Sequence, residues 1–223
     1  MAFNQPAVSR SAESVLATNK VLRNTYSLLS MTLLFSALMA AVSMYVETGP
    51  GTYLLSVGGA FLLIWLVLPR TANSSAGIGV VFAITGLLGF SLGPILSQYL
   101  ALPNGAQLIM TALGGTGVIF LGLSGYALTT KRDFSFLGGM LFVGLLVILF
   151  AALGNIFFAI PALSLAISAA VILLFSGFIL YDTSRIINGG ETNYIMATVA
   201  LYLDIFNIFI HLLNLLGALS GDD

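Results

Sequence analysis

The stretch YIMATVALYLDIFNIFIHLLNLLGAL, from Tyr194 to Leu219, decides the fold class of this chain. It is longer than the roughly 20 apolar residues that a membrane-crossing helix needs. Four polar residues lie in it at spacings of three, four and three: Asp204, Asn207, His211 and Asn214. Asn193, just before the stretch, falls on the same side. Such spacing places them on one helical face, and a polar face cannot lie against lipid. We therefore expect this helix to be central, with other helices around it.

The composition excludes an ordinary water-soluble domain. Hydrophobic residues make up 59% of the 223 residues and charged residues only 7%, whereas soluble domains carry about a quarter charged residues. The absence of cysteine excludes disulfides and thiolate metal sites, and a single histidine excludes a His-rich metal site. The net charge of −1, without a basic stripe, gives no indication of nucleic-acid binding.

Six further apolar stretches precede the last one, separated by short breaks of turn-forming or charged residues. The predicted spans are Leu22–Met44, Thr52–Pro69, Ala76–Gln98, Ala106–Thr129, Phe134–Leu153, Ala162–Tyr181 and Tyr194–Leu219. The sequence predicts an all-α polytopic membrane protein, a bundle of seven transmembrane helices with a central polar C-terminal helix. Its parts are a tail over 1–20, a membrane domain over 21–219 and a short tail over 220–223. Glycines in the third and fourth spans predict close helix packing there.

The basic residues predict how the chain is oriented. With the N-terminus in the cytoplasm, the cytoplasmic segments hold every Lys and Arg in the chain: Arg10, Lys20, Arg23, Arg70, Lys131, Arg132 and Arg185. The other side holds only Glu47, Asp222 and Asp223 as charged residues. The positive-inside rule thus favours a cytoplasmic N-terminus and an external C-terminus. Because no basic residue follows the last span, a re-entrant last helix is the alternative.

Two carboxylates within the spans are the main candidate site. A carboxylate at the bilayer centre costs about 2.5–3.5 kcal/mol on insertion scales. Asp204 lies near mid-depth, and Asp182 ends the preceding span at its cytoplasmic side. Because the two helices are consecutive and antiparallel, the acids can face one another. Such a pair holds one proton between its members and responds to pH, or binds a hard cation such as calcium weakly.

Arg70, Asp204 and His211 each allow a functional and a purely structural interpretation. Arg70, at the cytoplasmic end of the second span, is a candidate latch that pairs with the acids, or an interfacial anchor whose long side chain reaches the headgroups. Asp204 can be a sensor or a structural hydrogen-bonded acid. His211 is more typical of a satisfied packing residue than of a ligand. No nucleophile–base pair, HExxH sequence or phosphate-binding loop is present, so the sequence does not indicate an enzyme or a required cofactor.

Several stretches resemble the Bax inhibitor family of seven-span membrane proteins over residues 20–219. They are GLLGFSLGPIL in the third span, GFILYDTSRIINGG at the end of the sixth, and ATVALYLDIFNIF in the last. KVLRNTYSLLS, LTTKRDFSFLGGM and NGGETNYIMATV are similar to a bacterial inner-membrane branch whose members modulate the FtsH membrane AAA protease.

The resemblance implies two functions. The branch implies an inner-membrane regulator that binds the FtsH protease complex, with the N-terminal tail as the place where the protease begins to pull. The wider family implies a pH-gated calcium leak in which Asp182 and Asp204 form the sensor and Arg70 the latch. The two are compatible, but the leak requires Asp204 and the regulator does not.

Overall fold

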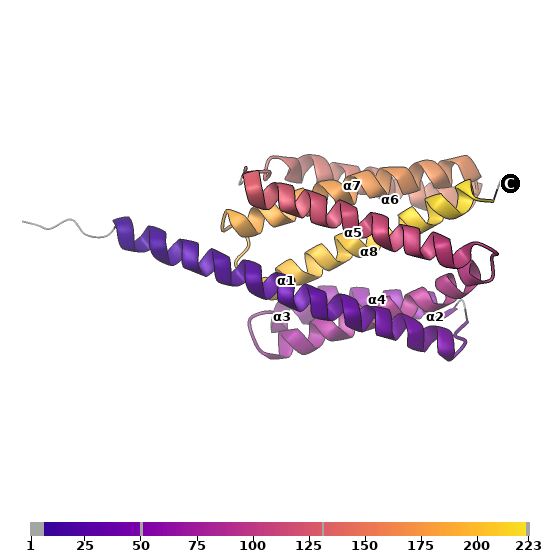
Figure 1. Cartoon of the computed structure of the whole chain (residues 1–223), viewed down its shortest axis with the longest axis horizontal. Helices are drawn as coiled ribbons and strands as arrows, with labels where there is room; N and C mark the ends of the chain where they lie inside the picture. Colours follow the sequence, from indigo (N-terminus) through magenta and orange to yellow (C-terminus); the bar gives the residue numbers. More distant parts are fainter. Residues whose placement is uncertain (1–6, 50, 131, 222–223) are drawn as a thin grey trace, which may run out of the picture.

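The chain is entirely helical apart from short connections in the computed structural model, which describes residues 7–49, 51–130 and 132–221 (Figure 1). In chain order the elements are α1 (Ala7–Tyr45), α2 (Gly51–Leu62), the π-helix η1 (Leu63–Val67), α3 (Leu68–Thr71), α4 (Ala76–Leu100), α5 (Gly105–Thr130), α6 (Leu137–Phe158), α7 (Pro161–Ile187) and α8 (Tyr194–Leu219). The described residues contain no strand. The predicted all-α class is confirmed.

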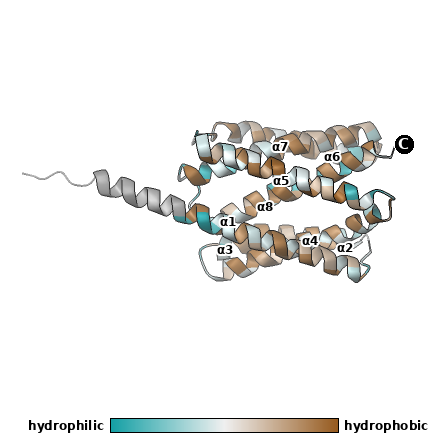
Figure 2. Cartoon of the chain, viewed as in Figure 1, coloured by the Kyte–Doolittle hydropathy of each residue, from teal (hydrophilic) through white to brown (hydrophobic). Residues whose placement is uncertain are grey.

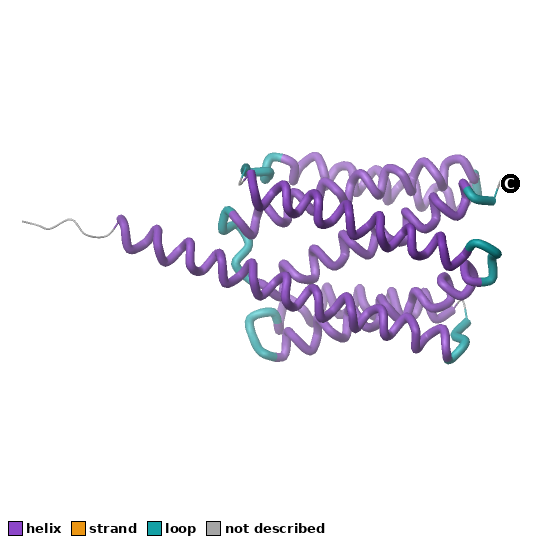
Figure 3. The backbone as a smooth tube through the Cα atoms, in the orientation of Figure 1, coloured by secondary structure: helices purple, strands orange, loops and turns teal. Residues whose placement is uncertain are grey.

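Within the described part of the chain, seven helical stretches are long and apolar enough to cross a membrane: Lys20–Tyr45, Gly51–Thr71, Ala76–Leu100, Gly105–Thr130, Leu137–Phe158, Pro161–Ile187 and Tyr194–Leu219. Hydrophobic residues predominate along all of them (Figure 2), and the loops that join them lie at the two ends of the bundle (Figure 3). The protein is therefore a polytopic membrane protein with the predicted number of spans. The last stretch is one continuous helix, as long as its neighbours, and is not broken as a re-entrant segment would be.

Span boundaries differ most where glycine was expected to break a helix. Helix α6 continues through Gly154 and Asn155 to Phe158. It ends because Ala159 adopts a left-handed conformation (φ 48°, ψ 42°), and the Asn155 side chain accepts a hydrogen bond of 3.0 Å from the Ile160 N–H. Helix α7 likewise continues past the predicted end to Ile187, which places Asp182 inside the helix. An isolated glycine weakens a helix by only about 1 kcal/mol, which is less than the cost of leaving backbone hydrogen bonds unmade in lipid.

The second span contains a π-helical turn, η1, that the sequence analysis did not predict. Pro69 lies two residues after it and has no N–H to donate to the preceding turn. Side chains also bond to the backbone here: the Arg70 guanidinium donates to the carbonyl of Leu66, and the Thr71 hydroxyl donates to that of Val67 at 2.9 Å. The wide turn is thus the local response of a lipid-facing helix to proline.

Helix α8 lies between two groups of helices. Figure 1 shows α1 to α4 on one side and α5 to α7 on the other, with α8 crossing between them. Helix α8 makes extensive contact with α1, α5 and α7 and also contacts α4. Its residues Leu201, Tyr202 and Ile208 are almost completely buried in the core. The central position that the polar face predicted is confirmed.

Glycine allows close packing in one of the two predicted spans. A Cβ at Gly89 of α4 would collide with the backbone of Ser36 of α1, and one at Gly93 would collide with Ser43. The expectation was wrong for most of the fourth span, because Gly114, Gly117, Gly122 and Gly125 of α5 have open space where a Cβ would lie. No other described helix packs closely against these four positions.

Helix α1 is longer than a membrane crossing. Its 39 residues extend for about 58 Å at 1.5 Å per residue, against a hydrocarbon thickness of about 30 Å. The stretch long and apolar enough to cross a membrane is Lys20–Tyr45, and residues 7–19, which include Arg10 and Glu13, precede it in the same helix. The predicted boundary near residue 20 therefore falls within a helix. Residues 1–6, 222 and 223 of the predicted tails lie outside the described residues.

Candidate functional site

Asp204 occupies the buried centre of α8. Only 3% of the residue is exposed, and its Oδ2 atom has no hydrogen-bond partner among the described residues. Burying a carboxylate without partners is costly, and more so in a bilayer than in a soluble protein. Asp204 is therefore not the fully satisfied structural acid that one interpretation of the sequence expected.

Asp182 lies on α7 and is near enough to Asp204 for the charges of the two residues to interact. Its side chain is 13% exposed, so it is the shallower of the two acids. Helices α7 and α8 form one of the most extensive contacts of the bundle, which holds the two acids in the same region. The structure thus brings the predicted pair together.

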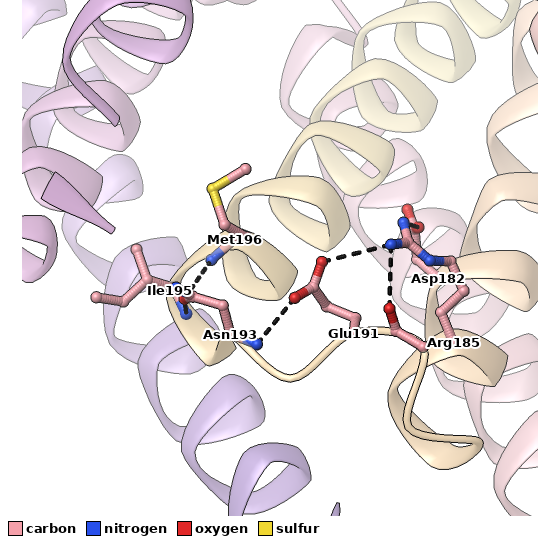
Figure 4. A network of polar contacts seen from close by, with 7 residues as sticks. Asp182, Arg185, Glu191, Asn193, Ile195 and Met196 are labelled. Carbon is pink, nitrogen blue, oxygen red and sulfur yellow. Dashed lines mark hydrogen bonds and ion pairs between the residues drawn. The ribbon is translucent and has the colours of Figure 1, made fainter. Parts of the chain in front are cut away.

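The cation beside Asp182 is Arg185, one turn further along α7. Its guanidinium lies 4.0 Å from Asp182 Oδ1 and 3.6 Å from Glu191 Oε2. The Glu191 carboxylate accepts a 2.8 Å hydrogen bond from the Asn193 backbone N–H. The Asn193 side chain in turn caps α8 by accepting from the N–H groups of Ile195 and Met196 (Figure 4). A chain of polar contacts therefore runs from the carboxylate site to the start of α8.

This network was not predicted. The spacing of Asp182 and Arg185 is the i,i+3 spacing of a helical ion pair, and it would have indicated the contact had the helix been extended past Tyr181. Asn193 was assigned to the polar face of α8, but it is the N-cap, and its amide donates to the Ala72 carbonyl at 3.0 Å. That bond ties the start of α8 to the end of the second span.

Arg70 does not contact the carboxylates in this structure. Its side chain is exposed, and its guanidinium donates to the Leu66 carbonyl of its own helix. That placement fits an interfacial anchor. The pairing of Arg70 with the two acids, as a latch, stays a prediction for another conformation.

The rest of the polar face lies toward the far end of α8. The Asn207 amide donates to the Leu203 carbonyl at 2.8 Å, and His211 Nδ1 lies 3.1 Å from the Ser168 hydroxyl of α7. Asn214 lines a cavity together with His211. His211 thus has the partner that its packing interpretation expected, yet it also borders open space.

The carboxylate pair alone makes a sparse cation site. No group of three or more His, Cys, Asp or Glu residues able to hold a metal ion occurs among the described residues. Calcium prefers six to eight oxygen ligands. Two carboxylates supply only part of such a ligand set.

Fold and site together define a class: seven-span, all-helical membrane proteins with an acid pair on the last two helices. The family model described as "Inhibitor of apoptosis-promoting Bax1" matches residues 18–221, and the chain belongs to this Bax inhibitor family. The resemblance predicted from the sequence is confirmed.

Individual relatives cover nearly the whole chain. It is 51% identical to the modulator of FtsH protease YccA of Escherichia coli strain K12, over 96% of this chain and 97% of that protein. It is 49% identical to an uncharacterized membrane protein of Vibrio cholerae, over 99% of this chain and all of that protein. An uncharacterized protein of Pseudomonas aeruginosa is 48% identical over 91% of each chain.

Proposed function

We propose that this chain is an inner-membrane regulator that binds and modulates an FtsH-type membrane AAA protease. The observation that carries the proposal is the 51% identity, over almost the full length, to a protein named as a modulator of that protease. The identity extends across all seven spans, so the helix surfaces that a membrane partner would meet come from a closely similar sequence. Nothing in this role requires a catalytic group.

The orientation completes the proposal. The described basic residues Lys20, Arg23, Arg70, Arg132 and Arg185 all lie at one end of the bundle, which we call the basic end. The positive-inside rule places this end in the cytoplasm and the C-terminus on the opposite, periplasmic side. The first turns of α1 then extend into the cytoplasm, where the ATPase and protease domains of such an enzyme work.

The test measures binding and turnover separately. Co-purification of the full chain with the protease complex from detergent-solubilised membranes is expected, as is slower degradation of a membrane substrate when the chain is present. A chain lacking residues 2–18 should itself be degraded more slowly if the protease engages the tail first. Failure to co-purify, with unchanged substrate turnover, would refute the regulator.

A second candidate function is a cation leak gated by the acid pair. The observation that favours it is Asp204, which is buried and has an unpartnered carboxylate oxygen beside the charge of Asp182. Protonation removes the cost of the buried charge, so the site responds to pH. We expect calcium flux in proteoliposomes to depend on pH between mildly acidic and mildly alkaline conditions, and Asp204→Asn to abolish that dependence.

Asp133 provides the matched control. It lies in the loop before α6, where the Ser135 backbone N–H donates to its carboxylate at 2.8 Å and lowers its pKa below the usual value. It therefore stays ionised over the tested range, and Asp133→Asn should leave the pH profile unchanged. An unaltered profile in Asp204→Asn would remove that residue from the gate. The regulator should tolerate both substitutions.

A further inference from the structure

A polar cavity lies at the end of the bundle opposite the basic end, away from the acid pair. It has a volume of about 240 Å³ between α6, α7 and α8. Five of its lining residues are polar: Asn155, Ser164, Ser168, His211 and Asn214. A cluster of amides, hydroxyls and an imidazole within apolar spans is costly unless water or protein satisfies it. This cavity is large enough for several water molecules. Its five polar residues can supply the two to four hydrogen-bond partners that a buried water requires.

The depth of the cavity follows from helix geometry. Ser164 is the fourth residue of α7 and Asn155 the fourth from the end of α6, so both lie about 5 Å from the helix ends. Ser168 and His211 lie about 10–12 Å from the ends of their helices. The cavity therefore reaches from near the membrane surface to about a third of the hydrocarbon thickness.

His211 forms the boundary between this cavity and a second one. A smaller cavity of about 120 Å³ lies between α2, α4 and α8, and it is lined by both Asn207 and His211. The Ser168 hydroxyl holds the imidazole at 3.1 Å on the side of the first cavity. Asp204 lies on the same face of α8, two helical turns or about 10 Å from His211, and Asn207 lies between them. The polar face of α8 thus runs from the two cavities toward Asp204.

The lining favours cations over anions. Among the described residues, no Lys or Arg lies at this end of the bundle, and Glu47 is the only charged residue there. Amide and hydroxyl oxygens can replace part of the hydration shell of a cation, whereas an anion would meet no fixed positive charge among the described residues.

We propose that the cavity between α6, α7 and α8 is a water-filled vestibule that admits small cations from the side opposite the basic end. His211, held by Ser168, closes its inner end toward Asn207. This inference deepens the cation-leak proposal by naming the entry route and its barrier. It does not depend on flux, because it concerns which residues water and cations reach.

The natural absence of cysteine makes the test direct. Ser164→Cys and Ser168→Cys are nearly isosteric, and each introduces the only thiol in the full-length protein. A membrane-impermeant cationic thiosulfonate, applied from the side opposite the basic end, modifies only thiols that ionise in water. Phe150→Cys is the control: Phe150 is 69% exposed on the outside of α6, and antiparallel packing places it at about the depth of Ser168.

We expect Ser164→Cys and Ser168→Cys to react at least about tenfold faster than Phe150→Cys, because only water supports the thiolate. The cationic reagent should also react faster than an anionic reagent of the same size, when each rate is divided by that reagent's rate with a free thiol in solution. Labelling of the two serine positions no faster than Phe150→Cys would overturn the vestibule, and faster labelling by the anion would overturn its cation preference.

The barrier is tested in the same way. Asn207→Cys should label slowly in the otherwise unchanged chain and about tenfold faster when combined with His211→Ala, since the thiol then meets water from the vestibule. Equal rates with and without His211 would show that another residue closes the route. The control is the labelling rate of Ser164→Cys, which should be the same with and without His211→Ala. An unchanged rate confirms that the bundle keeps its fold. All of these rates are independent of protease binding and of Asp204→Asn.

Discussion

Helices α6 and α8 have similar lengths and are both apolar enough to cross a membrane, yet they have opposite surroundings. Helix α6 packs mainly against α7 and buries only Leu141, whereas α8 contacts α1, α4, α5 and α7 and carries the polar face. In a bilayer, apolar residues gain little by moving from lipid into protein. The position of a helix in the bundle is therefore set by its polar groups, which must lie away from lipid. The helix with the polar face takes the central position.

The sharpest test of this comparison is a matched pair of leucines. Leu201 of α8 is fully buried, and Leu149 of α6 is 50% exposed. Leu201→Ala leaves a cavity among packed helices and should lower the free energy of unfolding by about 2–4 kcal/mol. Leu149→Ala exchanges one lipid contact for another and should cost less than about 1 kcal/mol. Thermal unfolding in detergent micelles measures both, and equal losses would mean that α6 is packed against a partner.

The second test concerns the start of α8. Asn193 caps the helix and also donates to Ala72 and Asn73, whereas α6 begins without a side-chain cap. Asn193→Ala should lower stability by about 1–2 kcal/mol, the upper part of the range for N-caps, because it also frees the second span. Exposed Thr192, one residue earlier, is the control, and Thr192→Ala should have little effect. Similar unfolding temperatures for the two variants would contradict the role of the cap.

A third test uses a buried hydroxyl, which α8 has and α6 lacks among the described residues. The Tyr202 hydroxyl lies 2.6 Å from the Ser36 hydroxyl of α1 and donates to the Thr85 carbonyl of α4 at 3.3 Å. Such bonds contribute about 0.5–1.5 kcal/mol, and those within membranes lie near the lower value. A double-mutant cycle of Tyr202→Phe and Ser36→Ala should therefore give a coupling energy of about 0.5–1 kcal/mol. A coupling near zero would show that each hydroxyl has other partners.

The spans and the central helix could be predicted because the bilayer imposes strict rules on length and polarity. Seven apolar stretches of sufficient length and one polar face leave few arrangements, and the pairing of Asp182 with Asp204 follows from consecutive antiparallel helices. The partner of a side chain does not follow in the same way. Whether Arg70 or Arg185 meets Asp182 depends on helix ends and on rotation about the helix axis, and a shift of a few residues changes both.

The cavities were beyond prediction for a related reason. His211 and Asn214 were placed on the correct face, but the cavity that they border also depends on Asn155, Ser164 and Ser168. Those residues lie on helices whose apolar sequences give no rotational signal. The continuation of α6 to Phe158, against the expected break at Gly154, brings Asn155 into the cavity. Local sequence favoured a turn there, but a lipid-embedded segment must satisfy its backbone hydrogen bonds internally, so the helix continues.

The smallest expected effect is a glycine-to-alanine substitution, which should change the free energy of unfolding in opposite directions in α6 and α8. A Cβ at Gly154 of α6 would meet nothing within 4 Å, whereas one at Gly217 of α8 would press on the ring of Tyr99. Gly154→Ala should raise stability by about 0.5 kcal/mol, because alanine loses less backbone entropy in a helix. Gly217→Ala should lower it by about 1 kcal/mol, because the ring must move. Unfolding temperatures that shift in the same direction would mean that helix propensity, and not the surroundings of each helix, decides what the two positions tolerate.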